Sequence, residues 1–220
     1  MYPDGSKEDQ GREERKTKAG CQRSFSMKKD IILAGVGGQG ILSIAAVIGM
    51  AALNSGLQLK QAEVHGMSQR GGDVHSNLRI ADHEIYSDLI PFGKADLIIS
   101  VEPMESLRYL PWLSKDGWLI SNNVPHVNIP EYPDMEKIDE AIEAVRQHVL
   151  INADEMAKEL GMTRSANMVI LGAASPWLGI KYEALETAVR NIFGSKGAEI
   201  VGQNLKALAA GKEFAMVHHS

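Results

Sequence analysis

Short runs of apolar residues alternate along this chain with longer segments in which apolar residues recur at helical spacing. Ile31-Ile32-Leu33-Ala34 is a continuous apolar run that ends in a glycine cluster, which is typical of a buried central strand. After the glycines, apolar residues recur every three or four positions from Ile41 to Ala52, and this helix should end near Asn54-Ser55-Gly56. The chain is therefore predicted to open with a strand, a glycine turn and a helix.

The same alternation continues to the end of the chain. Further strands are predicted over residues 57–65, 73–80, 95–101, 118–121 and 149–152. Helices are predicted over residues 103–110, 136–147, 154–160, 165–175, 183–192 and 198–210, and residues 122–134 are predicted to be an exposed loop. This order predicts an α/β fold of three layers, with a mostly parallel sheet and a Rossmann-like, glycine-rich strand–turn–helix start.

The strand predicted over residues 73–80 has one polar face. Its apolar residues Val74, Leu78 and Ile80 alternate with polar residues, so the two kinds should lie on opposite faces of the sheet. The polar set is Asp73, His75, Asn77 and Arg79. Glu84-Ile85-Tyr86-Ser87, just beyond a turn at Asp82-His83, is the candidate for the hairpin partner of this strand.

Residues 1–29 differ from the rest, and residues 30–212 are predicted to form a single domain followed by a tail over 213–220. The first segment holds eight Lys or Arg, shows neither helical nor strand periodicity and lacks the apolar region of a secretory signal. We expect it to be disordered unless a partner orders it. It is interpreted either as a non-native leader before a natural start at Met27, which we favour, or as an arm that lies on a partner.

Composition and charge exclude several classes of protein. The chain has 220 residues, 44% of them hydrophobic, which is enough to build a core without a disulfide or a structural metal. Its formal charge of −5 argues against a general nucleic-acid binder, and no run approaches the roughly 18 apolar residues of a membrane helix. The single cysteine, Cys21, cannot hold an iron–sulfur cluster, and no metal site is predicted. The scarcity of cysteine fits a reducing cytoplasm.

The first motif is the glycine loop Gly35-Val36-Gly37-Gly38-Gln39-Gly40, which matches G-x-G-x-x-G between a strand and a helix. Glycines let a ligand approach the backbone closely, and the N-terminus of the following helix favours an anion. Glu63 lies 23 residues beyond Gly40, near the position of a ribose ligand in dinucleotide-binding folds. Three interpretations stay open: a dinucleotide site, a tight turn that serves packing alone, and a site for an anionic group of another ligand or a partner chain.

The second motif covers residues 63–76, where hydroxyl, amide, guanidinium and imidazole groups lie between glycines. Arg70 offers a planar fork for a carboxylate or a phosphate, and Gly71-Gly72 would let the backbone bend beside it. Arg70 could equally form a structural ion pair with Glu63 or Asp73. For His75, as for His65, ordinary hydrogen bonding is favoured over catalysis.

Taken together, the motifs resemble a known family. The residues that carry the resemblance are Gly-Val-Gly-Gly-Gln-Gly at 35–40, Glu63-x-His65-Gly66-Met67-Ser68-Gln69-Arg70-Gly71-Gly72 with Ser76 and Arg79, and Arg164-x-x-Asn167-Met168 with Leu171-Gly172. The chain resembles, over about residues 28–210, the gamma domain of 2-oxoacid:ferredoxin oxidoreductases, and within that family the separate small (beta) subunit of indolepyruvate ferredoxin oxidoreductases. The loop over residues 65–72 carries most of this resemblance.

The resemblance implies an activity that the chain would support only within a complex. Such enzymes oxidatively decarboxylate a 2-oxoacid, here indolepyruvate or another aryl pyruvate, join the acyl group to coenzyme A and pass electrons to ferredoxin. It further implies that thiamine diphosphate and iron–sulfur clusters lie on a large partner subunit, and that this chain alone binds no cofactor. A Rossmann-type NAD(P)- or FAD-binding protein is the alternative function, and a stand-alone interaction module is a third.

The resemblance also implies which residues form the site. Gly37, Gly38, Gln39 and Gly40 would face a cofactor anion or the partner, and Asn167 would join them. Ser68, Gln69 and Arg70 would face the active-site cleft, although no catalytic role is assigned to them. Arg70 would meet a substrate carboxylate, a phosphate of coenzyme A or the partner chain.

Overall fold

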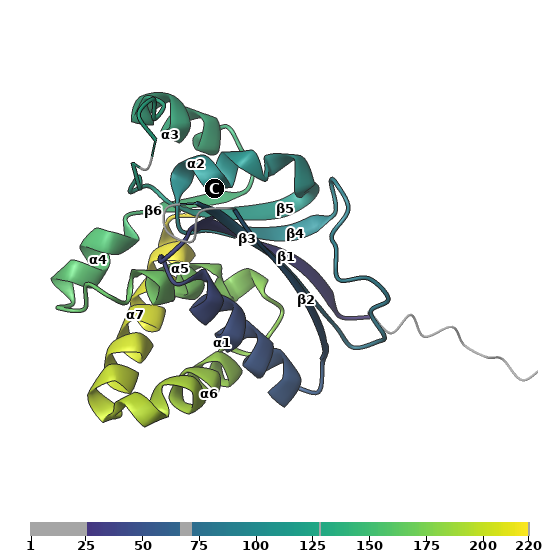
Figure 1. Cartoon of the computed structure of the whole chain (residues 1–220). Coiled ribbons are helices and arrows are strands. Elements are labelled where there is room, and N and C mark those ends of the chain that lie inside the picture. The colour runs from purple at the N-terminus through teal and green to yellow at the C-terminus, as the bar shows by residue number, and fades with distance from the viewer. Residues whose placement is uncertain (1–25, 67–71, 128, 220) are drawn as a thin grey trace, which may run out of the picture.

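The computed structural model describes residues 26–66, 72–127 and 129–219, and these form a six-stranded sheet covered by helices on both faces (Figure 1). The strand order is β2-β3-β1-β4-β5-β6, and within the described residues β3 alone runs against the other strands. The strands are β1 (Lys28–Val36), β2 (Gln58–His65), β3 (Asp73–Ala81), β4 (Ala95–Ser100), β5 (Leu113–Asn122) and β6 (His148–Ile151). The predicted α/β class and mostly parallel sheet are confirmed.

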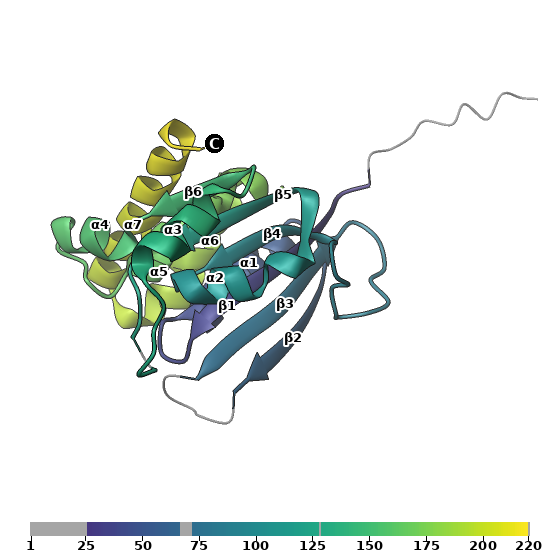
Figure 2. The same ribbon diagram turned by 90° about the horizontal axis from the view of Figure 1, so that it is seen from above.

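Seven α-helices within the described ranges complete the three layers (Figures 1 and 2). Two of them, α2 (Pro103–Arg108) and α3 (Met135–Glu143), cover one face of the sheet. The opposite face is covered by α1 (Ile41–Asn54), α4 (Ala153–Glu159), α5 (Ala166–Ala174), α6 (Tyr182–Phe193) and α7 (Ala198–Val217). The sheet is thus buried on both sides over most of its width.

The apolar run in β1 shows why this strand lies in the middle of the sheet. Ile31 and Leu33 enter the hydrophobic cluster under α1 and α5, whereas Ile32 and Ala34 enter the cluster under α2 and α3. Successive side chains of a strand point to opposite faces, so an unbroken apolar run can be buried only between two layers. β1 pairs with β3 on one side and with β4 on the other, as that reasoning requires.

Helices α5 and α7 pack against each other through glycines. A Cβ atom added at Gly172 of α5 would overlap the carbonyl oxygen of Leu208, and one added at Gly211 of α7 would overlap the carbonyl oxygen of Val169. The two backbones therefore lie in direct contact. This explains why the small-residue helix predicted at 165–175 is buried on almost every side.

The structure corrects the predicted hairpin partner over residues 84–87, which forms no strand. Instead, the segment is held as a loop against the sheet, because Arg79 Nη1 donates hydrogen bonds to the carbonyl oxygens of Ser87 (2.9 Å) and Leu89 (3.1 Å). Lys60 Nζ donates to the carbonyl oxygen of Tyr86 at 3.3 Å. β3 could not have accepted a hairpin partner there, because it already pairs along its length with β1 on one side and with β2 on the other.

Several element boundaries also differ from the prediction. β1 begins at Lys28, so residues 28 and 29 belong to the sheet and not to the predicted leader, whose residues 1–25 lie outside the described part of the chain. β5 begins at Leu113 rather than near Trp118, and α3 ends at Glu143 rather than at residue 147. α7 runs to Val217, through most of the predicted tail. Among the helices of the described residues, none has the length and apolar character that a membrane crossing needs.

Candidate functional site

The two glycine-rich motifs meet at the edge of the sheet where the parallel strands end. The first motif leaves β1 at Val36, and the second enters β3 at Asp73, which lies opposite Val36 in the sheet register. The amide of Gly37 donates to the carbonyl oxygen of Gly72 at 3.0 Å, and the amide of Gly66 donates to that of Asp73 at 2.8 Å. The sequence indicated ligand-binding chemistry at each motif separately, and the structure brings the two motifs into direct contact.

The first loop is shaped by glycines and closed by a glutamine. Gly38 and Gly40 have φ angles of 103° and 84°, in the left-handed region that favours glycine. Gln39 Oε1 accepts a hydrogen bond from the amide of Val36 at 2.8 Å, and Gln39 Nε2 donates to the carbonyl oxygen of Val101 at 3.4 Å. The amide of Gln39 therefore ties the loop to the end of β4, which is a structural task.

Asn167, at the start of α5, holds the same loop from the other side. Its Nδ2 donates to the carbonyl oxygen of Gly40 at 3.2 Å, and a Cβ atom added to Gly40 would lie 2.5 Å from that nitrogen. Asn167 thus contacts the glycine loop, and its part in binding a cofactor or the partner stays a prediction. One side of the asparagine amide positions the N-terminus of α1, and the residue also lines the cavity described next.

A cavity of about 360 Å³ opens beside Gly38 at the carboxyl ends of β1, β4 and β5. Open α/β sheets bind ligands at such ends, where the loops diverge. Charged and amide side chains both line its wall. Asn122 Nδ2 donates to Asp154 Oδ2 at 2.8 Å, and the exposed Arg164 lies at the rim. The lining residues are Gly38, Gln39, Val101, Asn122, Asp154, Thr163, Arg164, Ala166, Asn167 and Ile170.

A second cavity, of about 300 Å³, lies next to the same glycine and has a more apolar wall. It is lined by Val36, Gly37, Gly38, Gly40, Ile41, Leu42, His65 and Val74. Gly38 therefore stands between a polar and an apolar hollow, and no added Cβ atom at this residue would meet another atom within 4 Å. A ligand or a partner segment could approach the backbone here from either side.

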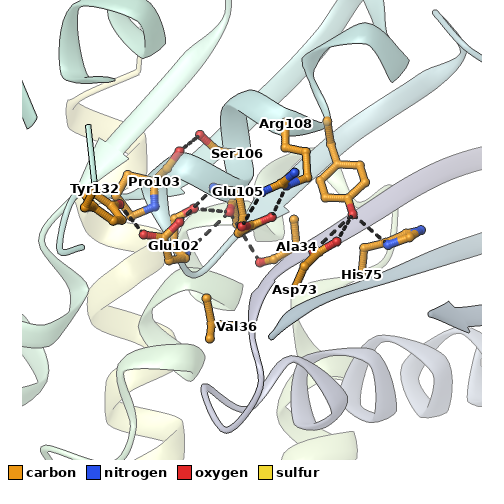
Figure 3. Close-up of polar contacts among 12 residues, drawn as sticks. Ala34, Val36, Asp73, His75, Glu102, Pro103, Glu105, Ser106, Arg108 and Tyr132 are labelled. Atoms are coloured by element: carbon orange, nitrogen blue, oxygen red, sulfur yellow. Dashed lines mark hydrogen bonds and ion pairs between the residues drawn. The ribbon is translucent and has the colours of Figure 1, made fainter. Parts of the chain in front are cut away.

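Buried charges lie on the α2 face of the same edge, and the sequence patterns did not single them out (Figure 3). The side chain of Glu105 is 2% exposed and forms an ion pair with Arg108, Nε to Oε2 at 2.7 Å. Burial raises the pKa of Glu105, and the hydrogen bond from Arg108 opposes that shift. Glu102 is fully buried and accepts hydrogen bonds from the hydroxyl of Tyr132 and, at 2.8 Å, from the amide of Glu105. This second carboxylate caps α2 and fastens the 123–134 loop.

Three predicted site residues are not placed by the structure. Ser68, Gln69 and Arg70 lie outside the described residues, so their expected positions in an active-site cleft stay predictions. The residues that flank them, Gly66 and Gly72, lie at the edge next to the first loop. Among the described residues, no group of three or more His, Cys, Asp or Glu side chains is arranged to hold a metal ion.

The strand order removes the structural basis for the dinucleotide interpretation of Glu63. In the Rossmann fingerprint the acidic residue follows a strand that neighbours the first one. Here β3 lies between β1 and β2, which puts Glu63 two strand spacings, or roughly 10 Å, from the glycine strand. The carboxylate of Glu63 instead contacts the imidazole of His65 on its own strand.

Comparisons with known proteins agree with the fold and with the motifs. The family model described as pyruvate ferredoxin/flavodoxin oxidoreductase matches residues 30–214. Over 194 residues the chain is 38% identical to "Indolepyruvate oxidoreductase subunit IorB" of Archaeoglobus fulgidus, covering 84% of this chain and 94% of that protein. The subunit of the same name from Pyrococcus horikoshii is 35% identical over 196 residues, covering 84% and 95% of the two chains.

Two solved structures share the fold at lower identity. The gamma subunit of a keto/oxoacid ferredoxin oxidoreductase from Geobacter sulfurreducens has a TM-score of 0.62 at 24% identity and covers 86% of this chain and 99% of that one. The 2-oxoglutarate:ferredoxin oxidoreductase of Magnetococcus marinus has a TM-score of 0.70 at 24% identity, covering 86% of this chain and 31% of that one. The match of the family model, which spans most of this chain, together with these relatives, shows that the chain belongs to the pyruvate ferredoxin/flavodoxin oxidoreductase family.

Proposed function

We propose that this chain is the small subunit of a 2-oxoacid:ferredoxin oxidoreductase that acts on indolepyruvate or a related aryl pyruvate. The complex would oxidatively decarboxylate the 2-oxoacid, transfer the acyl group to coenzyme A and pass the electrons to ferredoxin. One observation carries the proposal, namely the 38% identity to an indolepyruvate oxidoreductase subunit over 94% of that subunit's length.

The proposal divides the chemistry between two chains. Thiamine diphosphate, which supplies carbanion stabilisation, and the iron–sulfur clusters would both be held by a large partner subunit. The sequence supports this division, because Cys21 supplies one thiolate and the clusters are held by several. The task left to this chain is to bind and orient groups at the edge where its two glycine-rich loops meet.

The cavity beside Gly38 is the proposed place for an anionic part of coenzyme A or of the 2-oxoacid. The backbone is open to close approach at Gly38, and Arg164 puts a positive charge at the rim. The Magnetococcus structure, which shares this fold, has 2-oxoglutarate, coenzyme A and succinyl-CoA bound. Ser68, Gln69 and Arg70 are proposed to face the same edge, with Arg70 on a carboxylate, a phosphate or the partner chain. Low cysteine content supports a cytoplasmic complex.

The proposal is tested by reconstituting the complex from this chain and its large partner subunit. Ferredoxin reduction is measured with coenzyme A and with indolepyruvate, phenylpyruvate, pyruvate or 2-oxoglutarate in turn. We expect activity that requires both chains and that is highest with the aryl pyruvates. Turnover by this chain alone would contradict the division of labour, and preference for 2-oxoglutarate or pyruvate would overturn the substrate assignment.

A further inference from the structure

Three side chains at the site edge form one hydrogen-bonded chain that the proposed function does not use. The hydroxyl of Tyr109, which follows α2, lies 3.0 and 3.2 Å from the two carboxylate oxygens of Asp73 and 2.8 Å from Nδ1 of His75 (Figure 3). The rings of Tyr109 and His75 also contact each other, with centroids 4.7 Å apart. Tyr109 is buried, and these are the polar contacts of its hydroxyl within the described residues.

Counting protons fixes the direction of each hydrogen bond among Tyr109, Asp73 and His75. A phenol hydroxyl has a single proton, and an ionised carboxylate can only accept. Tyr109 must therefore donate its proton to Asp73. The hydroxyl oxygen is then free to accept, and among the described residues the group placed to donate to it is Nδ1–H of His75. A neutral imidazole that carries its proton on Nδ1 has an acceptor lone pair on Nε2.

The electrostatics of the cluster favour these protonation states at neutral pH. Burial lowers the pKa of His75, and the nearby charge of Asp73 opposes that shift in part. Burial, followed by the charge of Asp73, raises the pKa of Tyr109, which keeps the hydroxyl protonated. From the sheet, the strand partners of His75 are Val64 and Ala34, which bring no further charge to it. From α2, Glu105 faces Asp73, whose charge adds to the effect of burial in raising the pKa of Glu105, and Arg108 pairs with Glu105 and opposes that shift.

The imidazole of His75 is not fully covered, since His75 is half-buried. Figure 2 shows its strand, β3, and the neighbouring β2 extending beyond α2 and α3. The ring nitrogen of His75 opposite Nδ1 points away from Tyr109 (Figure 3). Val64, the cross-strand neighbour on the same face, is 47% exposed. A group that arrives at this edge can therefore reach the imidazole.

We propose that Tyr109 and Asp73 are positioning residues that hold His75 as a neutral hydrogen-bond acceptor, through Nε2, for an N–H or O–H donor brought to this edge in the assembled enzyme. The inference rests on the proposed function for the existence of that assembly. The donor belongs either to a substrate of the complex or to the partner subunit, and the chemistry that His75 recognises is the same in both cases. Protonation of His75 at acidic pH would turn Nε2 into a donor and abolish this recognition.

The tautomer is tested first on this chain by itself, independently of any activity. Nitrogen-15 NMR of the imidazole side chains distinguishes a protonated Nδ1 from a protonated Nε2. We expect the Nδ1–H form for His75 in the wild type and a mixture of both forms in Tyr109→Phe, which keeps the ring and removes the hydroxyl. Tyr132→Phe, which removes a hydroxyl bound to Glu102, is the matched control and should leave His75 unchanged. An Nε2–H form in the wild type would overturn the proposal.

The role of the acceptor is tested in the reconstituted complex with two substitutions. His75→Gln places an amide near the position of Nε2, whereas the shorter His75→Asn reaches only the position of Nδ1. We expect His75→Asn to lose about threefold to tenfold in function, as for one hydrogen bond, and His75→Gln to retain most of it. The wild type should lose function as the pH falls through the lowered pKa of His75, and His75→Gln should not.

Two measurements separate the sources of the donor. A loss in kcat/KM at saturating partner subunit assigns the donor to a substrate, and a weaker dissociation constant for the partner with kcat/KM intact assigns it to that subunit. Wild-type levels of both quantities in His75→Asn would overturn the inference. A wild-type complex that is assembled but inactive would instead contradict the proposed function, and the NMR result would stand apart from it.

Discussion

Gly40 shows how one residue position can depend on a side chain far along the sequence. Its φ of 84° costs any other residue about 1–2 kcal/mol, and an added Cβ atom would lie 2.5 Å from Asn167 Nδ2. We expect Gly40→Ala to lower the free energy of unfolding by about 2–4 kcal/mol, because the backbone strain and the clash add. Chemical denaturation of this chain measures the change.

Gly56 supplies the matched control for this substitution. It has a φ of 77°, yet a Cβ atom there would meet nothing within 4 Å. Gly56→Ala should therefore cost only the backbone term of about 1–2 kcal/mol. Adding Asn167→Ala to Gly40→Ala should recover about 1 kcal/mol of the loss, since the clash is relieved. Equal costs at the two glycines would contradict the contact with Asn167.

Arg79 and Asp30 form an ion pair at a buried position of the sheet. Asp30 is fully buried, and its carboxylate accepts from Arg79 Nε at 2.7 Å and Nη2 at 3.2 Å. Removal of one partner of a buried pair leaves an uncompensated charge and costs about 3–5 kcal/mol. We expect Arg79→Met to destabilise the chain by about that amount, with Lys28, 2.6 Å from Asp30, lessening the loss.

The Arg79→Met substitution should also release the 84–90 loop, because Arg79 donates hydrogen bonds to the carbonyl oxygens of Ser87 and Leu89. Hydrogen exchange of that loop together with thermal unfolding measures both effects. Arg146→Met is the control, since the pair of Arg146 with Asp116 is exposed and 4.0 Å long, and its loss should cost less than about 1 kcal/mol. An effect at Arg79 as small as this control would show that the buried pair does not stabilise the fold.

At the scale of elements, the contact between α5 and α7 depends on glycines that a helix would otherwise disfavour. Gly211→Ala would drive a methyl group into the carbonyl oxygen of Val169, and we expect a loss of about 3 kcal/mol or more. Gly202 lies in the same helix with nothing within 4 Å of its added Cβ atom. Gly202→Ala should instead stabilise the chain by about 0.5–1 kcal/mol. Denaturant unfolding of both variants checks the opposite signs, and a loss at both positions would refute the close crossing.

The sequence predicts an element well when the residues that determine it lie within a few positions of one another. The apolar run at 31–34 predicted β1, and the helical spacing from Ile41 to Ala52 predicted α1, because each pattern repeats within a few residues. The end of α7 was missed at Gly211, since a glycine reads as a helix end unless its contact with α5 is known. The hairpin over 84–87 was wrong for a related reason, because β3 already pairs with β1 and β2, and its pairing with β1 joins residues far apart in the sequence.

The same distinction between local and distant contacts applies to the candidate site. The glycine loop and its helix could be found from spacing, and the resemblance of the motifs led to Asn167. The contacts that build the edge join distant residues, such as Asn167 with Gly40 and Tyr109 with Asp73 and His75. No periodicity records such pairs. Spacing alone also left open a ribose role for Glu63, one of three interpretations of the glycine loop, and the position of β3 between β1 and β2 does not fit it.

For the whole molecule, these contacts converge on one end of the sheet, and Arg164 tests whether that end binds an anion. The chain has a formal charge of −5, so a polyanion such as coenzyme A needs local positive charge to approach. Arg164 lines the 360 Å³ cavity beside Gly38. In the reconstituted complex we expect Arg164→Ala to raise the KM for coenzyme A about threefold to tenfold with kcat unchanged, because an exposed charge contributes to uniform binding.

The exposed Arg190 of α6, which is not among the lining residues of that cavity, is the control, and Arg190→Ala should leave both constants unchanged. The stability of the isolated chain should be the same in both variants, since each arginine is exposed. If Arg164→Ala raises the KM for the 2-oxoacid instead, the anion at the cavity is the substrate carboxylate. If neither KM changes, the polar cavity is not a binding site, and the apolar hollow on the other side of Gly38 becomes the better place to look for the partner.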